Sequence, residues 1–115
     1  GTILTEAEKA AQILEEKGIS VEIVHMHTVK PLDNNLIKDR IIKRKAIFTI
    51  EEHSIIGGLG DAVAELISEG RKEKPIFKRF GVNDIYLSEI GSQEYLRDRH
   101  GISGKKIAGK ILELL

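Results

Sequence analysis

The chain has 115 residues, of which 41% are hydrophobic, so it can bury one core and is expected to form a single domain over residues 1–115. Lys plus Arg and Asp plus Glu both number 18, and this balance gives no basic field that would attract nucleic acid or an anionic membrane surface. The absence of cysteine excludes disulfides and thiolate chemistry. No apolar run approaches the roughly 20 residues of a membrane span, and no signal peptide is visible, so we expect a cytoplasmic protein.

A helix is predicted near the start of the chain. Thr5 to Glu8 fit the capping-box pattern, in which a Thr hydroxyl and a Glu carboxylate satisfy free backbone amides at a helix start. They predict a helix from about Glu6 to Lys17 that ends at Gly18, a residue suited to the left-handed conformation. The small side chains on its apolar face predict close packing against a sheet, and this face consists of Ala7, Ala10, Ala11 and Leu14.

A strand and a short helix are expected next. The segment Ile19 to Met26 is rich in Val and Ile, which predicts a strand buried on both faces of a parallel sheet. Pro31 ends regular structure, and Asp33 can cap a short helix. The cations Lys43 to Lys45 complement the negative end of that helix dipole, which favours a solvated helix end over a phosphate-binding patch. The apolar residues of the short helix are Leu36, Ile37, Ile41 and Ile42.

The stretch from Ala46 to Leu66 predicts a strand, a loop and a helix. Residues Ala46 to Ile50 are β-branched or aromatic and too few for a helix. Gly57, Gly58 and Gly60 interrupt the pattern and allow a close approach of another backbone or a ligand. A helix then follows that Gly70 closes, and its apolar face consists of Leu59, Ala62, Val63, Leu66 and Ile67.

The last third of the chain predicts a further strand and two helices. Ile76 to Phe80 reads as a strand, and Tyr86 and Leu87 continue an extended segment. Ser92 can cap a helix to about His100, which Gly101 ends. Ser103 can cap the last helix, whose apolar face consists of Ile107, Ala108, Ile111, Leu112 and Leu115.

The alternation of helices and strands indicates an α/β fold with a mostly parallel sheet covered by helices on both faces. Because the chain becomes helical within a few residues of Gly1, the strand that should feed this helix is missing. We therefore expect a fragment that begins just after a strand of its parent protein.

Glu51, Glu52 and His53 follow the predicted strand and could form an acid/base group. Adjacent residues of an extended segment point to opposite sides, so only Glu51 and His53 could cooperate directly. A structural or interface role, such as hydrogen bonds that hold the following loop, is favoured over catalysis.

Two other patterns have both a binding and a packing interpretation. The glycine loop before the third helix could bind phosphate, but it lacks the G-x-G-x-x-G order, and Asp61 would compete with an anion. Close packing of the loop is therefore favoured. His25 and His27 share a strand face but have no third ligand at a recognisable spacing, so packing is favoured over a metal site.

Four motifs together resemble one family in their order and spacing. They are HTVKPLD (His27 to Asp33), FTIEEHSIIGGLGDAVAE (Phe48 to Glu65), FGVNDIY (Phe80 to Tyr86) and YLRDRHGIS (Tyr95 to Ser103). Nearly the whole chain is similar to the C-terminal domain of transketolase-type thiamine-diphosphate enzymes. The resemblance implies a three-layer α/β/α domain with a mostly parallel, mixed five-stranded sheet, and it supplies the missing strand directly before Gly1.

The resemblance also implies that catalysis and cofactor binding belong to other domains of the parent enzyme. The parent enzyme is expected to be a cytoplasmic dimer that transfers a two-carbon ketol unit between sugar phosphates, as in the pentose phosphate pathway. Its thiamine diphosphate and Mg²⁺ are carried by pyrophosphate- and pyrimidine-binding domains, which are the expected partners of this chain. The chain alone is then not catalytic and binds no cofactor or metal; its interface candidates are Lys30, Pro31, Asp33, Glu52, His53, Gly57, Gly58 and Gly60.

An alternative parent is 1-deoxyxylulose-5-phosphate synthase or the β subunit of a 2-oxoacid dehydrogenase. In that case the domain would dock a partner or regulate the enzyme. The charged segments Arg71 to Lys74 and Lys105 to Lys110 would then be the contact surfaces.

Overall fold

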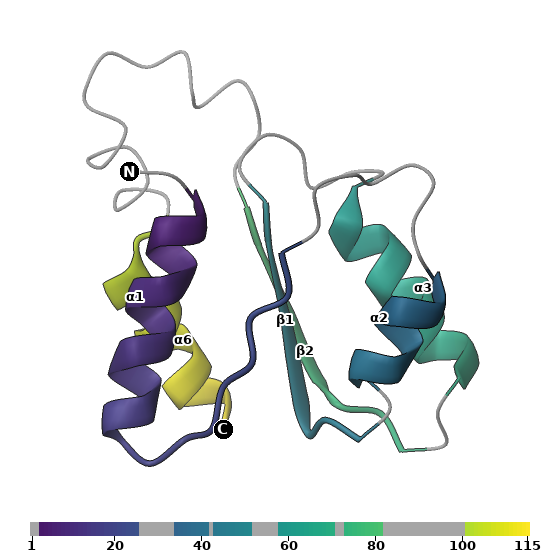
Figure 1. Cartoon of the computed structure of the whole chain (residues 1–115), viewed down its shortest axis with the longest axis horizontal. Coiled ribbons are helices and arrows are strands. Elements are labelled where there is room, and N and C mark those ends of the chain that lie inside the picture. Colours follow the sequence, from purple (N-terminus) through teal and green to yellow (C-terminus); the bar gives the residue numbers. More distant parts are fainter. Residues whose placement is uncertain (1–2, 26–33, 42, 52–57, 71–72, 82–100) are drawn as a thin grey trace.

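A parallel sheet lies at the centre of the computed structural model, which describes residues 3–25, 34–41, 43–51, 58–70, 73–81 and 101–115 (Figure 1). Strand β1 (Ala46–Glu51) pairs with strand β2 (Ile76–Gly81), and the register runs from Ala46 opposite Ile76 to Glu51 opposite Gly81. The strands predicted at Ala46 to Ile50 and Ile76 to Phe80 are confirmed, and they pair in parallel as expected. Within the described residues the sheet has these two strands.

Helices cover both sides of this sheet. Helices α1 (Ile3–Glu16) and α6 (Gly104–Leu114) lie on one side, and α2 (Asn34–Ile41) and α3 (Leu59–Gly70) lie on the other (Figure 1). This arrangement is the α/β architecture that the alternation of elements predicts.

The alternation of side chains along the strands divides the core into two clusters. Phe48, Ile50 and Phe80 face α1 and α6, whereas Ile47 and Phe77 face α2 and α3. The buried members of the first cluster are Ala10, Leu14, Phe80, Ile102, Ile107, Ala108 and Ile111, and those of the second are Ile41, Val63, Leu66 and Ile67. The predicted helix faces are largely confirmed, but Leu115 is 55% exposed and does not belong to the core.

Helix α1 begins at Ile3, earlier than the capping-box pattern predicts. Thr5 therefore lies inside the helix and cannot be its N-cap, so that prediction is wrong. The end of the helix is predicted correctly: Gly18 has φ = 83°, and the amide of Ile19 donates to the carbonyl of Leu14 over 3.1 Å.

Helices α1 and α6 approach closely at Gly104. A Cβ atom on Gly104 would lie 2.5 Å from Cβ of Lys9 and 2.9 Å from the carbonyl oxygen of Glu6. The buried carboxylate of Glu6 also accepts a hydrogen bond from the Gly104 amide over 3.0 Å. Ser103 is the N-cap of α6, as predicted, and its hydroxyl accepts from the amide of Lys106 over 3.3 Å. The small residues of α1 thus pack against α6 as well as against the sheet.

The predicted strand from Ile19 to Met26 is wrong for residues 19–25, which form no strand in the described part of the chain. Ile19 and Val21 pack against the first cluster, but Ile23 and Val24 are each 41% exposed. β-Branched residues favour an extended backbone, but a strand also requires a neighbour that accepts and donates backbone hydrogen bonds.

Other predictions fall outside the described residues. They concern Met26, Pro31, Asp33, the extended segment at Tyr86 and Leu87, and the helix from Ser92 to His100.

Candidate functional site

Glu51, the last residue of β1, binds the start of α3. Its half-buried carboxylate accepts hydrogen bonds from the amide of Leu59 over 2.6 Å and from the amide of Gly60 over 3.1 Å, one on each oxygen. The first amides of a helix have no partner within the helix and carry partial positive charge. The carboxylate satisfies two of them and complements the helix dipole. Glu51 therefore fixes the carboxyl edge of the sheet to the start of α3.

A second contact joins α3 to β2. Arg79 Nη1 donates to Asp61 Oδ1 over 2.5 Å, and the arginine side chain crosses Gly60 so closely that a Cβ atom there would clash with Arg79 Nε. Gly60 is buried and helical, and a larger residue there would displace the Arg79 side chain from its present position. The predicted packing role of Gly60 is supported.

These contacts argue against phosphate binding at the glycine loop. The amides of Leu59 and Gly60 already donate to Glu51, and the amide of Ala62 donates to the carbonyl of Gly58 over 3.3 Å. Three amides at the start of α3 that could bind an anion are thus occupied.

Of the interface candidates, Gly58 and Gly60 lie in the described part of the chain, at the start of α3. The other candidates lie outside the described residues: Lys30, Pro31, Asp33, Glu52, His53 and Gly57. Their roles stay predictions.

The acid that holds the loop is Glu51, which the sequence interpretation considered together with Glu52 and His53 but did not single out. Both of its oxygens accept backbone hydrogen bonds, which favours the structural role over an acid/base role. The alternation of side chains along β1 could have predicted this role. Glu51 lies on the same face of the strand as Ile47, which packs toward α3.

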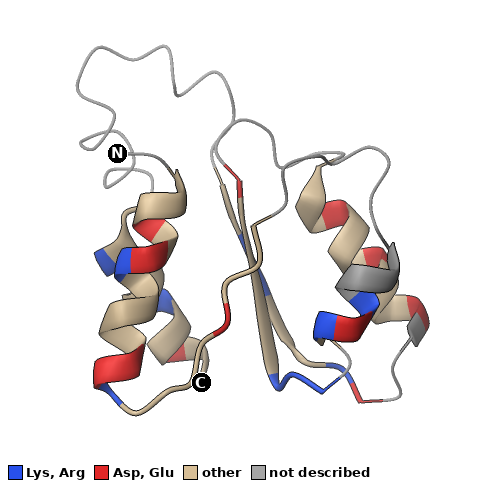
Figure 2. Ribbon diagram, in the orientation of Figure 1, with Lys and Arg blue, Asp and Glu red and all other residues tan. Residues whose placement is uncertain are grey.

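One of the three cations after α2, Arg44, binds the end of that helix, in agreement with the predicted helix-end role. Arg44 Nε donates to the carbonyl of Arg40 in the last turn over 3.2 Å. The two arginines also pair with Glu22, through Arg40 Nη1 at 3.2 Å and Arg44 Nη2 at 3.3 Å. Figure 2 shows basic residues at the lower end of α2 and on the chain that leads into β1. The pairing with Glu22 joins α2 to the segment after α1.

No group of three or more His, Cys, Asp or Glu side chains that could hold a metal occurs among the residues that the structure describes. His25 is exposed, and His27 lies outside those residues. None of the described helices is long and apolar enough to span a membrane.

The fold, with the end of β1 held to the start of α3, defines an α/β domain of the class that the sequence motifs indicate. The family model for the transketolase C-terminal domain matches residues 1–107. The chain belongs to the transketolase C-terminal domain family, and the resemblance read from the motifs is confirmed.

Relatives include both transketolases and synthases. The chain is 42% identical over 113 residues to a transketolase C-terminal section of Methanocaldococcus jannaschii, covering 98% of this chain and 34% of that protein. It is 38% identical over 108 residues to a 6-deoxy-6-sulfo-D-fructose transketolase subunit of Clostridium sp., covering 93% of this chain and 32% of that protein. For 1-deoxy-D-xylulose-5-phosphate synthase 2 of Geobacter sulfurreducens the identity is 39% over 114 residues, covering 99% of this chain and 18% of that protein.

A solved structure has the same fold. It is a split-gene transketolase described as an inactive beta4 tetramer, with a TM-score of 0.81 and 34% identity, covering 100% of this chain and 37% of that chain. The chain thus spans about a third of the length of its transketolase relatives, and less of the synthase.

Proposed function

We propose that this chain is the assembly domain of a thiamine-diphosphate-dependent transketolase and carries no catalytic residue of its own. The parent enzyme would transfer a two-carbon ketol unit between sugar phosphates. Thiamine diphosphate and Mg²⁺ would be bound by its pyrophosphate- and pyrimidine-binding domains, which are the partners of this chain in a homo-oligomer.

The observation that carries this proposal is the double hydrogen bond from the start of α3 to Glu51. The strand-end carboxylate holds the start of α3 at the edge where open α/β sheets place their sites and interfaces. A strand end and a helix start that are held together form a surface that another domain can bind without first ordering it. Glu52 and His53 follow Glu51 in the sequence, Gly57 precedes Gly58, and these residues would contribute to the surface.

The test combines this chain with the remainder of its parent enzyme, expressed without residues 1–115. We expect the addition of the chain to raise both the molar mass, measured by light scattering, and the rate of ketol transfer. Glu51→Ala should weaken the association, because the start of α3 is no longer held to the end of β1, whereas Glu65→Ala, at an exposed position on α3, should not. If mass and activity stay unchanged on addition of the intact chain, the assembly role is wrong.

The same reconstituted enzyme separates the two candidate parents. Formation of 1-deoxy-D-xylulose 5-phosphate in place of ketol transfer would assign the chain to a synthase. The cytoplasmic location and the dimeric state of the parent stay predictions.

A role in docking a separate partner has less support. In the charged segment that ends at Lys74, the Lys74 ammonium donates to the carbonyls of Ile67 and Ser68 over 3.1 and 3.0 Å. This lysine therefore binds the carboxyl end of α3.

A further inference from the structure

Two strands hold the start of α3 at successive residues. Glu51 of β1 accepts hydrogen bonds from the amides of Leu59 and Gly60, and Arg79 of β2 donates to Asp61, the next residue of the helix. The two strands are themselves paired in parallel, so both attachments come from one sheet. The first turn of α3 is therefore attached to both strands of the pair.

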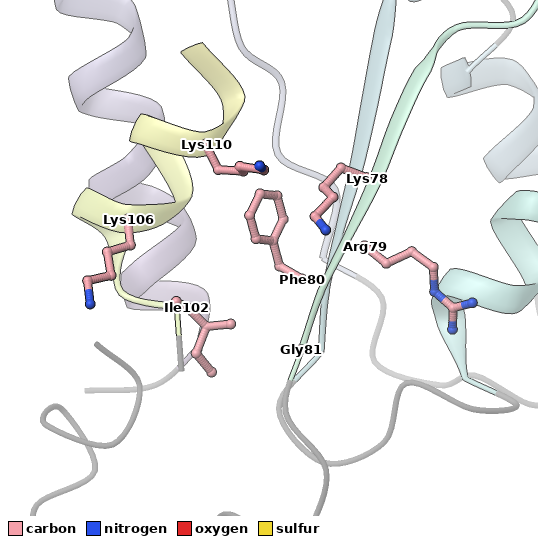
Figure 3. A pocket seen from close by; sticks show the side chains of 8 residues that line it. Lys78, Arg79, Phe80, Gly81, Ile102, Lys106 and Lys110 are labelled. Atoms are coloured by element: carbon pink, nitrogen blue, oxygen red, sulfur yellow. The ribbon is translucent and has the colours of Figure 1, made fainter. Parts of the chain in front are cut away.

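The direction of the Arg79 side chain follows from the alternation along β2. Phe77, two residues earlier, packs in the cluster formed with α2 and α3, so Arg79 lies on the same face of the strand. Lys78 and Phe80 lie on the opposite face, where Phe80 packs with α1 and α6. Figure 3 shows Arg79 and Lys78 extending to opposite sides of β2.

The apolar packing of α3 leaves its first turn to these polar contacts. The buried apolar residues of the helix are Val63, Leu66 and Ile67, which lie beyond the residues that Glu51 and Arg79 contact. The Arg79 side chain also lies against the backbone of Gly60, where a Cβ atom would meet the guanidinium. Contacts from two different strands restrict the tilt of a helix end more than contacts from one strand do.

We propose that Arg79 is a positioning residue for domain assembly, acting through Asp61 on the surface formed by the end of β1 and the start of α3. This inference rests on the proposed assembly function and adds a residue to it. A surface that is held in its binding conformation before the partner arrives loses less entropy on association. Arg79 acts on that conformation, because its guanidinium pairs with Asp61 over 2.5 Å.

The exposure of the pair separates this role from a general contribution to stability. The Arg79 side chain is 27% exposed and that of Asp61 is 45% exposed. Ion pairs this accessible to water contribute little to the free energy of unfolding. Loss of the pair should therefore weaken the association with the partner domains more than it destabilises the chain.

The experiment measures the dissociation constant between the 115-residue chain and the remainder of its parent enzyme by calorimetry, at a temperature where every variant is folded. Arg79→Met should weaken the association several-fold, and Arg79→Lys should recover part of the loss, because an ammonium group can still pair with Asp61. Lys78→Met removes the same charge from the opposite face of β2 and should leave the association unchanged.

Two further measurements test whether Arg79 acts on the start of α3. In NMR spectra of the chain alone, the amide signals of Leu59 and Gly60 should shift in Arg79→Met and stay in place in Lys78→Met. The difference in affinity between the intact chain and Arg79→Met should also narrow as ionic strength rises, because salt screens a partly exposed pair.

A double-mutant cycle tests the route through Asp61. Asp61→Asn should weaken the association several-fold, and the variant with both substitutions should bind no more weakly than Arg79→Met alone. Additive effects would show that Arg79 acts independently of Asp61, and would overturn the proposal.

The outcomes for the two proposals differ. If the intact chain does not associate with the remainder of the enzyme, the assembly function is rejected and the role of Arg79 with it. If the intact chain associates and Arg79→Met binds equally well, or Lys78→Met loses as much affinity as Arg79→Met, the role of Arg79 alone is rejected.

Discussion

At the scale of single residues, Glu51 links two elements that the backbone connects only through a glycine-rich loop. Its carboxylate receives the amides of Leu59 and Gly60, which lie eight and nine residues further along the chain. Hydrogen bonds to a charged acceptor are stronger than those between neutral groups. The end of β1 is therefore held to the start of α3.

We expect Glu51→Ala to lower the free energy of unfolding by about 1–2 kcal/mol, the usual cost of losing a helix cap. The two amides would lose a half-buried acceptor and would depend on water. Urea denaturation followed by circular dichroism measures the change. Glu65→Ala, at an exposed position on α3, should change stability by less than about 0.5 kcal/mol. Equal effects of the two substitutions would contradict the capping role.

The two helix caps show which residue roles the sequence can predict. Ser103 caps α6 through the amide of Lys106, three residues away, so the pattern is local and was predicted. Glu6 caps the same helix from 98 residues away, and no local pattern contains that contact. The role of Glu51 could be predicted only in part. The sequence indicates which face of the strand it lies on, but its partners depend on where α3 begins relative to β1.

At the scale of elements, Gly104 sets how closely α1 and α6 approach. The atoms that a Cβ on Gly104 would meet include the backbone of Glu6 and Ala10, which cannot move without shifting α1. Gly109 on the same helix has no atom within 4 Å of a corresponding Cβ. Gly109 therefore serves as a control for substitutions at Gly104.

Gly104→Ala should destabilise the protein by about 1–3 kcal/mol, because the added methyl overpacks the contact between α1 and α6. Gly109→Ala should stabilise it by up to about 1 kcal/mol, because alanine favours the helix and has room there. Thermal unfolding of both variants measures the difference. Stabilisation by Gly104→Ala would show that the helices can separate without cost.

Elements with a local cause were predicted better than those that depend on a neighbour. Gly18 ends α1 because it adopts φ = 83°, which the sequence indicates directly. The segment from Ile19 has the composition of a strand but forms none within residues 19–25. The β-branched residues of this segment favour an extended backbone. Whether such a segment forms a strand also depends on a neighbouring strand that can pair with it.

At the scale of the whole molecule, the sheet belongs to both hydrophobic clusters. Alternate residues of β1 and β2 point into one cluster or the other. Loss of packing on one side should therefore disturb the strands that the other side also uses. We expect the described elements to unfold as one cooperative unit.

Leu66→Ala tests this cooperativity. Leu66 is buried in the cluster formed with α2, and the substitution should cost about 2–5 kcal/mol. Methyl NMR signals of Ile67 and Ile107 report the two clusters separately during urea denaturation. Both midpoints should fall together. A shift confined to Ile67 would indicate two independent units.

The contact between Glu6 and Gly104 has a consequence for synthesis on the ribosome. The Ile107 and Ile111 side chains fill the cluster around Ala10 and Leu14. Helix α1 is synthesised before α6 and cannot complete the burial of its apolar face until α6 has been translated. Contacts between such distant parts of a chain slow folding, and a nascent α1 stays exposed to chaperones and to other chains until then.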